Sequence, residues 1–451
     1  MTLATDRTPE STTQSPGKSA AAKRVVMVQS FTDGQLDPAA PMLGPVTDGG
    51  TILASTAPGC WGPMITPELK GGHEVTVPVY VEGAEVGDAV AIRIRDVTVT
   101  SLATASGHDT SPEGHSLGDP YVAARCPVCD VVNPKTRVEG IGPNSVVCTT
   151  CGNPVTPFQF VHGSTAVFDE ERQIGVTVPD AVARQLAADP EQYVALPDGS
   201  VQHPILVYAP SDMPGVMLRA RPFLGQLGST PSKRMPDSHN AGDFGSALIG
   251  APHDSAITAE ELEEHRTDGH MDVNSVRAGA IVVVPSKVPG AGIYMGDMHF
   301  NQGNGEIAGH TLDVAGVATL EVEVIKDRVL EGPVIFPLVD DLPPVAKPFS
   351  AEERAQAQRL ADSYGVGPLE ESAPISVIGT GPTLNAATDN GIARAARLLG
   401  VTEGEIRNRA TVTGAIEIGR NPGVARVTFL APLSQLDAAG LGKLAREQYG
   451  L

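Results

Sequence analysis

The chain has 451 residues and a formal net charge of −21, because 53 Asp and Glu residues outnumber 32 Lys and Arg residues. Its 41% hydrophobic content supports a large buried core, and the length suggests two or three domains. The acidic balance repels nucleic-acid backbones and anionic membrane surfaces, so neither is expected as a partner.

The composition predicts a fold that is mainly β with some α, of the α+β class. The chain has 49 glycines and 38 prolines, and aromatic residues make up only 4% of it, which favours many short strands joined by turns. We expect a β-sandwich or barrel-like core of short strands. The chain has no apolar run of roughly 18 residues and no apolar signal core at its N-terminus, so we expect a cytoplasmic protein.

Shifts in composition divide the chain into sections. Residues 1–23 have no hydrophobic period and are expected to form a disordered tail. A β-rich core is expected over 24–345, interrupted by a zinc-ribbon-like insertion at 121–163. The Pro-rich segment 340–348 marks a boundary before an α/β C-terminal section of 346–451.

Three segments carry clear strand patterns. Residues 88–100 and 320–326 alternate apolar and polar positions, as half-buried strands do. Residues 279–285 form a continuous apolar run, which predicts a strand covered on both faces.

Four of the five cysteines form two CxxC knuckles, separated by 18 residues. Each knuckle directs two thiolates at one point, so Cys126, Cys129, Cys148 and Cys151 predict a closed, tetrahedral and therefore structural zinc site. A redox pair or disulfides are the alternatives, and a cytoplasmic location disfavours disulfides. The remaining Cys60 has no adjacent His and is expected to be a buried thiol rather than a nucleophile.

Residues 238–245 gather polar ligand types in a glycine-bearing loop. His239 and Asp243 lie four residues apart there. Together they could complete a metal shell or form a local hydrogen-bonded turn, and the sequence favours neither reading.

Two further segments each place an imidazole and a carboxylate two positions apart. His270 and Asp272 follow the turn-forming pair Asp268-Gly269, while Asp297 and His299 lie in a glycine-rich run. If each segment is extended, alternation puts both members of a pair on one face, where they can reach one metal ion or one substrate. Two such pairs are what a small hydrolytic metal site or an acid/base site requires. The alternative for Asp297 is an ordinary turn carboxylate.

A tight loop follows His299. Glu306 comes directly after Gly303-Asn304-Gly305, so it is either a general base placed by the turn or a surface charge after a loop.

Helical patterns appear late in the chain. Ser350 to Glu353 and Thr402 to Glu405 have the spacing of capping boxes, and the first predicts a helix ending near Tyr364 before Gly365. Residues 383–399 place apolar side chains on one face, with Gly400 at the C-cap position. The C-terminal section is therefore expected to be helical.

Four motifs, in order, resemble the acetamidase/formamidase family of amide hydrolases: 77–88, 222–228, Met271-Asp272 and 296–306. The resemblance spans roughly residues 25 to 345. Two positions depart from the family pattern: Asn304 stands where a Gly-Asp-Gly-Glu sequence is usual, and His270 where Asn-Met-Asp is common.

The resemblance implies hydrolysis of a small carboxylic amide, such as formamide or acetamide, to an acid and ammonia. A second divalent metal, for which zinc is the first candidate, would be held by His299 with Asp297, Asp272 or His239, and Glu306 would shuttle protons. His270, Gln302 and Asn304 are candidates for substrate contacts. The alternatives are a catalytically silent binding protein on the same scaffold and an amidase for a lactam or larger amide. For the mechanism, the alternative is a metal-free one, with Glu306 as base beside a backbone oxyanion hole in the glycine-rich loop. A homo-oligomer is also expected.

Overall fold

The computed structural model describes residues 24–59, 66–110, 124–155 and 159–451. The tail expected at 1–23 and the thiol of Cys60 lie outside the described residues. Residues 121–123 and 156–158 of the expected insertion also lie outside them.

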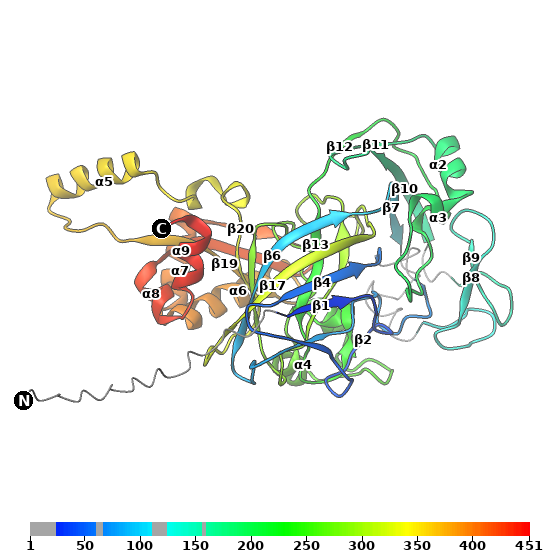
Figure 1. Ribbon diagram of the computed structural model, residues 1–451, viewed down its shortest axis with the longest axis horizontal. Helices are drawn as coiled ribbons and strands as arrows, with labels where there is room; N and C mark the ends of the chain where they lie inside the picture. The colour runs from blue at the N-terminus through cyan, green and yellow to red at the C-terminus, as the bar shows by residue number, and fades with distance from the viewer. Residues whose placement is uncertain (1–23, 60–65, 111–123, 156–158) are drawn as a thin grey trace, which may run out of the picture.

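A nine-stranded mixed sheet runs through the middle of the molecule (Figure 1). Its strand order is β1-β4-β17-β6-β15-β18-β19-β21-β20, in which β1 and β4 pair in parallel. The bounds of these strands, in the same order, are Val25–Val28, Thr51–Thr56, Gly316–Ile325, Ala89–Val99, Ile281–Pro285, Val334–Phe336, Ser372–Thr380, Val424–Pro432 and Ala415–Ile418. Short strands with added helices confirm the α+β prediction.

The central strand β15 is buried on both faces, as its apolar run predicts. Val282 and Val284 belong to one hydrophobic cluster, whereas Ile281 and Val283 belong to a second one on the opposite face. The alternation predicted for 320–326 is also present, because buried and half-buried positions alternate along most of β17. The side chains of β15 therefore alternate between two hydrophobic clusters, one on each face of the main sheet.

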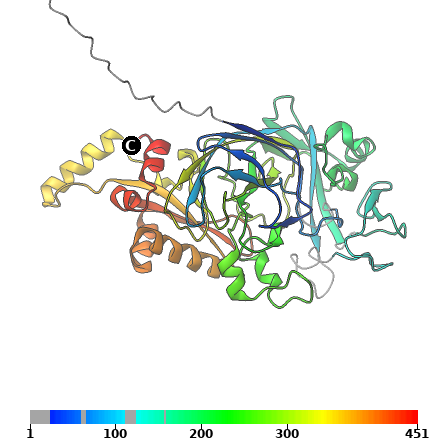
Figure 2. The ribbon, with the colours of Figure 1, turned by 60° about the horizontal axis from the view of Figure 1, so that its bottom comes forward.

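A four-stranded sheet packs against one face of the main sheet and carries Asp297 and His299 of the site. Its order is β13-β16-β5-β3, with bounds Phe223–Ser229, Ile293–His299, Val79–Val81 and Leu43–Val46. Leu227 and Met298 share one buried cluster with Ile92 and Leu320 of the main sheet. Figure 2 shows the strands curling around this shared core.

A third sheet and a cysteine-bearing segment lie at the end of the molecule opposite the C-terminus (Figure 1). The sheet has the order β12-β11-β10-β7, with bounds Met217–Arg219, Ile174–Thr177, Gln159–Phe168 and Ala103–Thr110. We call residues 124–155 the four-cysteine module, and it contains the hairpin of β8 (Thr136–Val138) and β9 (Val146–Cys148). Helices α2 (Asp180–Ala187) and α3 (Pro190–Tyr193) and the 3-10 turn η2 (Ile205–Tyr208) follow.

The C-terminal section combines helices with strands of the main sheet. Ser350 and Thr402 form the predicted capping boxes at α5 (Ala351–Tyr364) and α7 (Glu403–Thr413), and α6 (Leu384–Leu399) ends at Gly400. Helices α8 (Leu433–Ala438) and α9 (Gly442–Tyr449) complete the section. Because β19, β20 and β21 extend the main sheet, this section shares the sheet of the core, and the division at residue 346 stays a prediction.

Short elements around the site complete the fold. They are β2 (Gln35–Leu36), β14 (Met235–Pro236), α4 (Ala259–His265), and the 3-10 turns η3 (Asp237–His239), η4 (Phe244–Leu248), η5 (Val339–Asp341) and η6 (Pro344–Ala346). Among the described residues, no helix has both the length and the apolar character needed to cross a bilayer.

Candidate active site and cysteine cluster

The end of β16 is shaped by a residue in the left-handed conformation. Asp297 has φ of 55° and lies between the ladder pairs Leu224↔Met298 and Gln226↔Gly296. Gly225, on β13, therefore faces Asp297 without a side chain between them. A carboxylate in this sparsely populated region of φ/ψ space indicates a backbone held by its surroundings.

The segment that carries His270 and Asp272 packs against the same glycine. The amides of Met271 and Asp272 both donate to the carbonyl of Gly225 at 3.0 Å. Asp272 also has a positive φ, of 48°. Two segments far apart in sequence thus converge on Gly225.

Their imidazole and carboxylate groups meet at one buried centre. His299 Nε2 lies 3.4 Å from both Asp272 Oδ1 and Asp297 Oδ2. His270 Nε2 lies 3.0 Å from Asp272 Oδ2 and 3.9 Å from Asp297 Oδ2. At most 2% of each of these side chains is exposed. The structure therefore brings both sequence pairs together.

A third imidazole, which no sequence pattern singled out, also faces the centre. His73 Nε2 lies 3.5 Å from Asp297 Oδ2, and its ring packs edge-on against that of His270 at 4.9 Å. Two groups of possible metal ligands result, His73-His270-Asp297 and Asp272-Asp297-His299. They share Asp297.

The imidazole rings are oriented by contacts at their far nitrogens. His270 Nδ1 lies 2.7 Å from the carbonyl oxygen of Ser238, which can only accept, so Nδ1 carries the proton. His299 Nδ1 lies 2.8 Å from Asp313 Oδ1. Such outer contacts direct the Nε2 lone pairs inward, which is how ligand histidines of metal sites are held.

Gly225 leaves the space that a cation needs. A Cβ at this position would lie 2.7 Å from Asp297 Oδ2 and closer still to Asp272 Oδ1 and His299 Nε2. Carboxylate oxygens and imidazole nitrogens bind zinc at about 2.0–2.2 Å. The three candidate ligand atoms therefore surround a space of suitable size for a cation, and this space is open because residue 225 has no side chain. The residues fit a divalent cation.

Arg420 lies beside the centre and is almost fully buried. Its Nη1 donates to Asp272 Oδ2, while its Nη2 and Nε donate to Asp243 Oδ2 at 2.8 and 3.0 Å. Its guanidinium also stacks over the Phe244 ring at 4.2 Å. Asp243 therefore forms an ion pair and holds Arg420, rather than completing a metal shell with His239.

Glu306 reaches the centre through a loop paired with the Arg420 turn. The amide of Gly305 donates to Gly419 at 3.2 Å, and the amide of Asn421 donates to Gly305 at 2.9 Å. Glu306 is 6% exposed with φ of 43°, so it is buried rather than a surface charge. Gln302 Nε2 fastens the loop by donating to the carbonyls of Asp272 and Gly419.

Three sequence-predicted site residues have surroundings that differ from those expected. His239 belongs to neither group of possible ligands within the described residues, and it is Ser238 of the same turn η3 that contacts His73 and His270. Asn304 is exposed, and its Oδ1 accepts from Asn274 Nδ2 at 2.7 Å. His270, expected to contact substrate, lies among the ligand-type groups instead.

Burial and charge set the protonation of the two neutral imidazoles. Burial lowers the pKa of His73 well below its ordinary value, and His270 lowers it further. Burial also lowers the pKa of His270, and Arg420 acts in the same direction. Both rings are therefore neutral at physiological pH, the form that binds a metal ion.

The carboxylates and His299 are strongly perturbed. Burial raises the pKa of Asp297 to about 8, against the opposing effect of His299. Burial also acts to raise the pKa of Asp272, but His270 and Arg420 outweigh it and hold that pKa well below the ordinary value. The pKa of His299 is raised despite burial, because Asp297 and the neighbouring carboxylates stabilise its charged form. Such opposed shifts within one cluster are typical of functional sites.

Glu306 is shifted in the direction that suits proton transfer. Burial raises its pKa well above the ordinary value, and the charge of Asp272 adds to the effect. A carboxyl group with a raised pKa keeps its proton to higher pH than an ordinary glutamate does, which suits a group that accepts and returns a proton.

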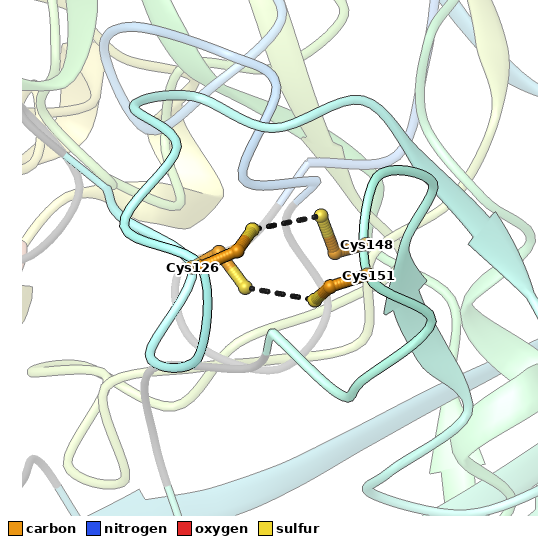
Figure 3. A group of neighbouring side chains, drawn as sticks. Cys126, Cys148 and Cys151 are labelled. Carbon is orange, nitrogen blue, oxygen red and sulfur yellow. Dashed lines mark hydrogen bonds between the residues drawn. The ribbon is translucent and has the colours of Figure 1, made fainter.

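The four knuckle cysteines form a separate cluster in the four-cysteine module (Figure 3). The Sγ atoms of Cys126 and Cys151 are 3.5 Å apart, and those of Cys129 and Cys148 are 3.8 Å apart. Thiolates bound to one tetrahedral zinc at about 2.3 Å lie about 3.8 Å from one another. The cluster could bind a metal ion, and its thiols are free rather than paired in disulfides.

A β-rich fold with a buried cluster of imidazoles and carboxylates defines a candidate hydrolase centre. A model of the Acetamidase/Formamidase family matches residues 60–430, and the chain belongs to this family. The resemblance noted in the sequence is thereby confirmed. The match extends beyond residue 345 to Arg420, so the C-terminal section is part of the family's fold.

Two curated relatives match parts of the chain. Formamidase of Methylophilus methylotrophus is 32% identical over 124 residues, which cover 25% of this chain and 30% of that protein. A putative formamidase of Schizosaccharomyces pombe is 27% identical over 158 residues, or 28% of this chain and 38% of that protein. The matched segments span well under half of each relative.

Solved structures share the fold over nearly the whole chain. An acetamidase from Yersinia enterocolitica superposes with a TM-score of 0.51 at 15% identity, covering 92% of this chain and 94% of that one. A predicted acetamidase/formamidase from Thermoanaerobacter tengcongensis gives a TM-score of 0.50 at 17% identity, covering 92% and 98%. At these identities the likeness shows the fold.

Proposed function

We propose that the protein hydrolyses a small carboxylic amide to a carboxylic acid and ammonia. The observation that carries the proposal is the convergence of His299, Asp297 and Asp272 on the space beside Gly225. Glu306 is buried and interacts electrostatically with all three. Membership in the Acetamidase/Formamidase family and the partial matches to two formamidases support the same reaction.

We also propose that the centre holds at least one divalent cation, with zinc as the first candidate. Its ligands would be drawn from two imidazole and carboxylate sets, Asp272-Asp297-His299 and His73-His270-Asp297. A cation bound there would activate a water molecule and polarise the amide carbonyl.

The chain's own residues would supply the remaining steps. Amide hydrolysis needs a nucleophilic water, a contact for the charge on the tetrahedral oxygen, and a proton for the departing amine. Glu306 takes a proton from the attacking water and returns it to the leaving nitrogen, a role that its raised pKa favours. Arg420 keeps Asp272 ionised and so holds it ready as a ligand.

The cysteine cluster is proposed as a structural zinc site. Four sulfur ligands fill a tetrahedral shell and leave no position open for substrate. The two knuckles also have matching backbones, since the amides of Asp130 and Gly152 donate to the carbonyls of Cys126 and Cys148. This similarity is what two halves of one metal site require.

A homo-oligomer stays a prediction, and α5 is the element that favours it. The helix projects from the body (Figures 1 and 2), and among its residues only Ala361 is buried. Leu360 and Tyr364 are 61% and 79% exposed. Light scattering of the purified protein would measure its mass directly, and a monomer would contradict the prediction.

Ammonia release from formamide, acetamide and longer primary amides tests the proposed reaction, and ring opening of a lactam to its amino acid tests the alternative substrate class. We expect turnover of at least one small linear amide, and loss of that turnover in the Glu306→Gln variant. Binding of amides without ammonia release in wild-type protein would instead support a catalytically silent relative. Ring opening of the lactam without ammonia release from any linear amide would show that the substrate is a cyclic amide.

A further inference from the structure

Residues 66–74, which we call the His73 segment, lie between the four-cysteine module and the active centre. His73 is at the inner end of this segment, 3.5 Å from Asp297. The outer end is not paired into any sheet, since the structure gives residues 67–73 only turns and bends. Contacts with other parts of the chain fix its path; among them, the Lys70 amide donates to the carbonyl of Asp33 at 2.8 Å and the Thr66 hydroxyl donates to the carbonyl of Val201 at 3.1 Å.

Asn133 of the four-cysteine module provides one of these contacts. Its side-chain Nδ2 donates two hydrogen bonds, to the carbonyl of Pro67 at 3.1 Å and to that of Leu69 at 3.0 Å. Both donors of one amide group are thus used on alternate carbonyls of the His73 segment. A lysine or hydroxyl group could not reproduce this planar pair of donors.

Asn133 is itself held by the first cysteine knuckle. Its backbone amide donates to the carbonyl of Ala124 at 2.7 Å, and its φ is 44°, a conformation that Asn tolerates better than most residues. Within the turn so closed, the amide of Cys126 donates to Val131 at 2.9 Å. Cys126 and Cys129 both lie within this turn, so the cysteine cluster and the Asn133 side chain depend on the same backbone.

The inner end of the segment is held separately. The His73 amide donates to Asp237 Oδ1 at 3.2 Å, and the His73 ring contacts the hydroxyl of Ser238. Glu74, the next residue, accepts from Ser200 Oγ at 2.5 Å and from the Val201 amide at 2.8 Å. Hydrogen bonds therefore hold the His73 segment at both ends, and those from Asn133 come from the four-cysteine module.

We infer that the four-cysteine module positions His73 in the active centre, and that Asn133 is the positioning residue that transmits its order. The inference rests on the proposed function and deepens it, because it gives the four-cysteine module a role in the active centre. An ordered cysteine cluster holds Asn133, Asn133 holds Pro67 and Leu69, and the segment presents His73 to Asp297.

The test removes the amide of Asn133 while keeping its backbone shape. Asn133→Gly retains the positive φ without strain but lacks both donors, and Asn133→Asp keeps the shape of the side chain but cannot donate. Asn144→Gly is the matched control, because Asn144 is exposed in the same module. Each variant is measured for amide turnover and for cobalt binding, with cobalt–thiolate absorption reporting the cysteine cluster separately.

We expect both Asn133 variants to keep cobalt–thiolate absorption equal to that of wild type. Their kcat should fall by about tenfold to 10²-fold, as expected for misplacement of a site group, and cobalt affinity at the imidazole centre should fall by about 10- to 100-fold. Asn144→Gly should match wild type in every measurement.

Turnover and centre affinity within twofold of wild type in both Asn133 variants would overturn the inference. Loss of cobalt–thiolate absorption in both would also overturn it, because the side chain would then act on the module rather than on the His73 segment. If wild-type protein hydrolyses no amide, the proposed function fails, and the cobalt titration of the imidazole centre still decides the coupling.

Discussion

The Arg420 guanidinium donates to the carboxylate of Asp272 through Nη1 and to that of Asp243 through Nε and Nη2. This contact joins the turn between β20 and β21 to the segment that contains His270. All three side chains are at most 2% exposed, so solvent screens their charges little. The C-terminal section therefore completes the electrostatics of a site whose ligands come from the core.

Replacing Arg420 with Met should destabilise the protein and disable the centre. The change leaves Asp243 and Asp272 buried without their cation, which costs about 3–5 kcal/mol for a broken buried pair. The pKa of Asp272 should rise, so that its ionised form is less available to a cation. Denaturant unfolding and amide turnover measure the two effects.

The double variant Arg420→Met/Asp243→Asn serves as the control for Arg420→Met. Removing the second unpaired charge should recover part of the lost unfolding free energy without restoring turnover. Full turnover in Arg420→Met would show that Asp272 needs no cationic partner.

Replacing Gly225 with Ala should remove the space at the centre with little change elsewhere. Its Cβ would lie 2.7 Å from Asp297 Oδ2 and nearer to two other ligand atoms, so it would exclude a cation. We expect turnover to fall by about 10²-fold or more, with loss of one bound metal ion. Gly404→Ala is the control, because Gly404 lies in α7 on the surface and its Cβ would meet only Thr402 Oγ1 at 3.8 Å. Unchanged metal content in Gly225→Ala would contradict a cation at this position.

His299→Ala should abolish amide turnover, and Asp313→Asn should weaken it in a graded way. His299 contacts both carboxylates of the centre through Nε2, whereas Asp313 contacts only its Nδ1. Loss of an outer-shell partner typically costs 10- to 100-fold in metal affinity or activity. His162→Ala, at an exposed ring paired with Asp212, is the control. Full turnover by His299→Ala would remove this residue from the mechanism.

Local sequence patterns were sufficient to predict the capped C-terminal helices and several strands. The side chains of Ser350 and Thr402 cap their helices as the spacing predicts, because a capping box depends on residues within one turn. Strands were expected in the α/β C-terminal section, but the positions of β19 and β21 were not predicted. Their place in the main sheet depends on pairing with β18 and with each other, which no local pattern specifies.

Part of the site could also be predicted, because some of its residues are close together in the sequence. His270, Asp272, Asp297 and His299 occur in pairs with short spacing, so each pair is visible within one segment. His73 and Arg420 are single residues whose partners lie far along the chain, and only folding brings them to the centre. The one local hint at His73 was the preceding Gly71-Gly72, since glycines also flank His299.

The purified protein should contain two separable classes of metal ion. The cysteine cluster and the imidazole centre use different residues. The Cys126→Ser/Cys129→Ser variant should therefore lose the thiolate-bound ion, while the ligands of the imidazole centre are unchanged. If Asn133 links the two centres, turnover should fall together with this loss although the ligands of the second centre are intact. Elemental analysis of wild type and variant measures the stoichiometry. A single class of metal ion that disappears completely with the cysteines would contradict a separate centre.

The pH profile of amide turnover should carry the signature of Glu306. A general base works when it is deprotonated, and the raised pKa of Glu306 means that it loses its proton only above the ordinary value of about 4.3. The value of kcat/KM should therefore rise with pH through a limb displaced above that value. Glu306→Gln should lower turnover by about 10²- to 10⁴-fold and remove this limb, because the amide does not titrate. If the variant kept the wild-type limb at reduced turnover, the titrating group would be a different one, with Asp297, whose pKa burial raises to about 8, as the next candidate.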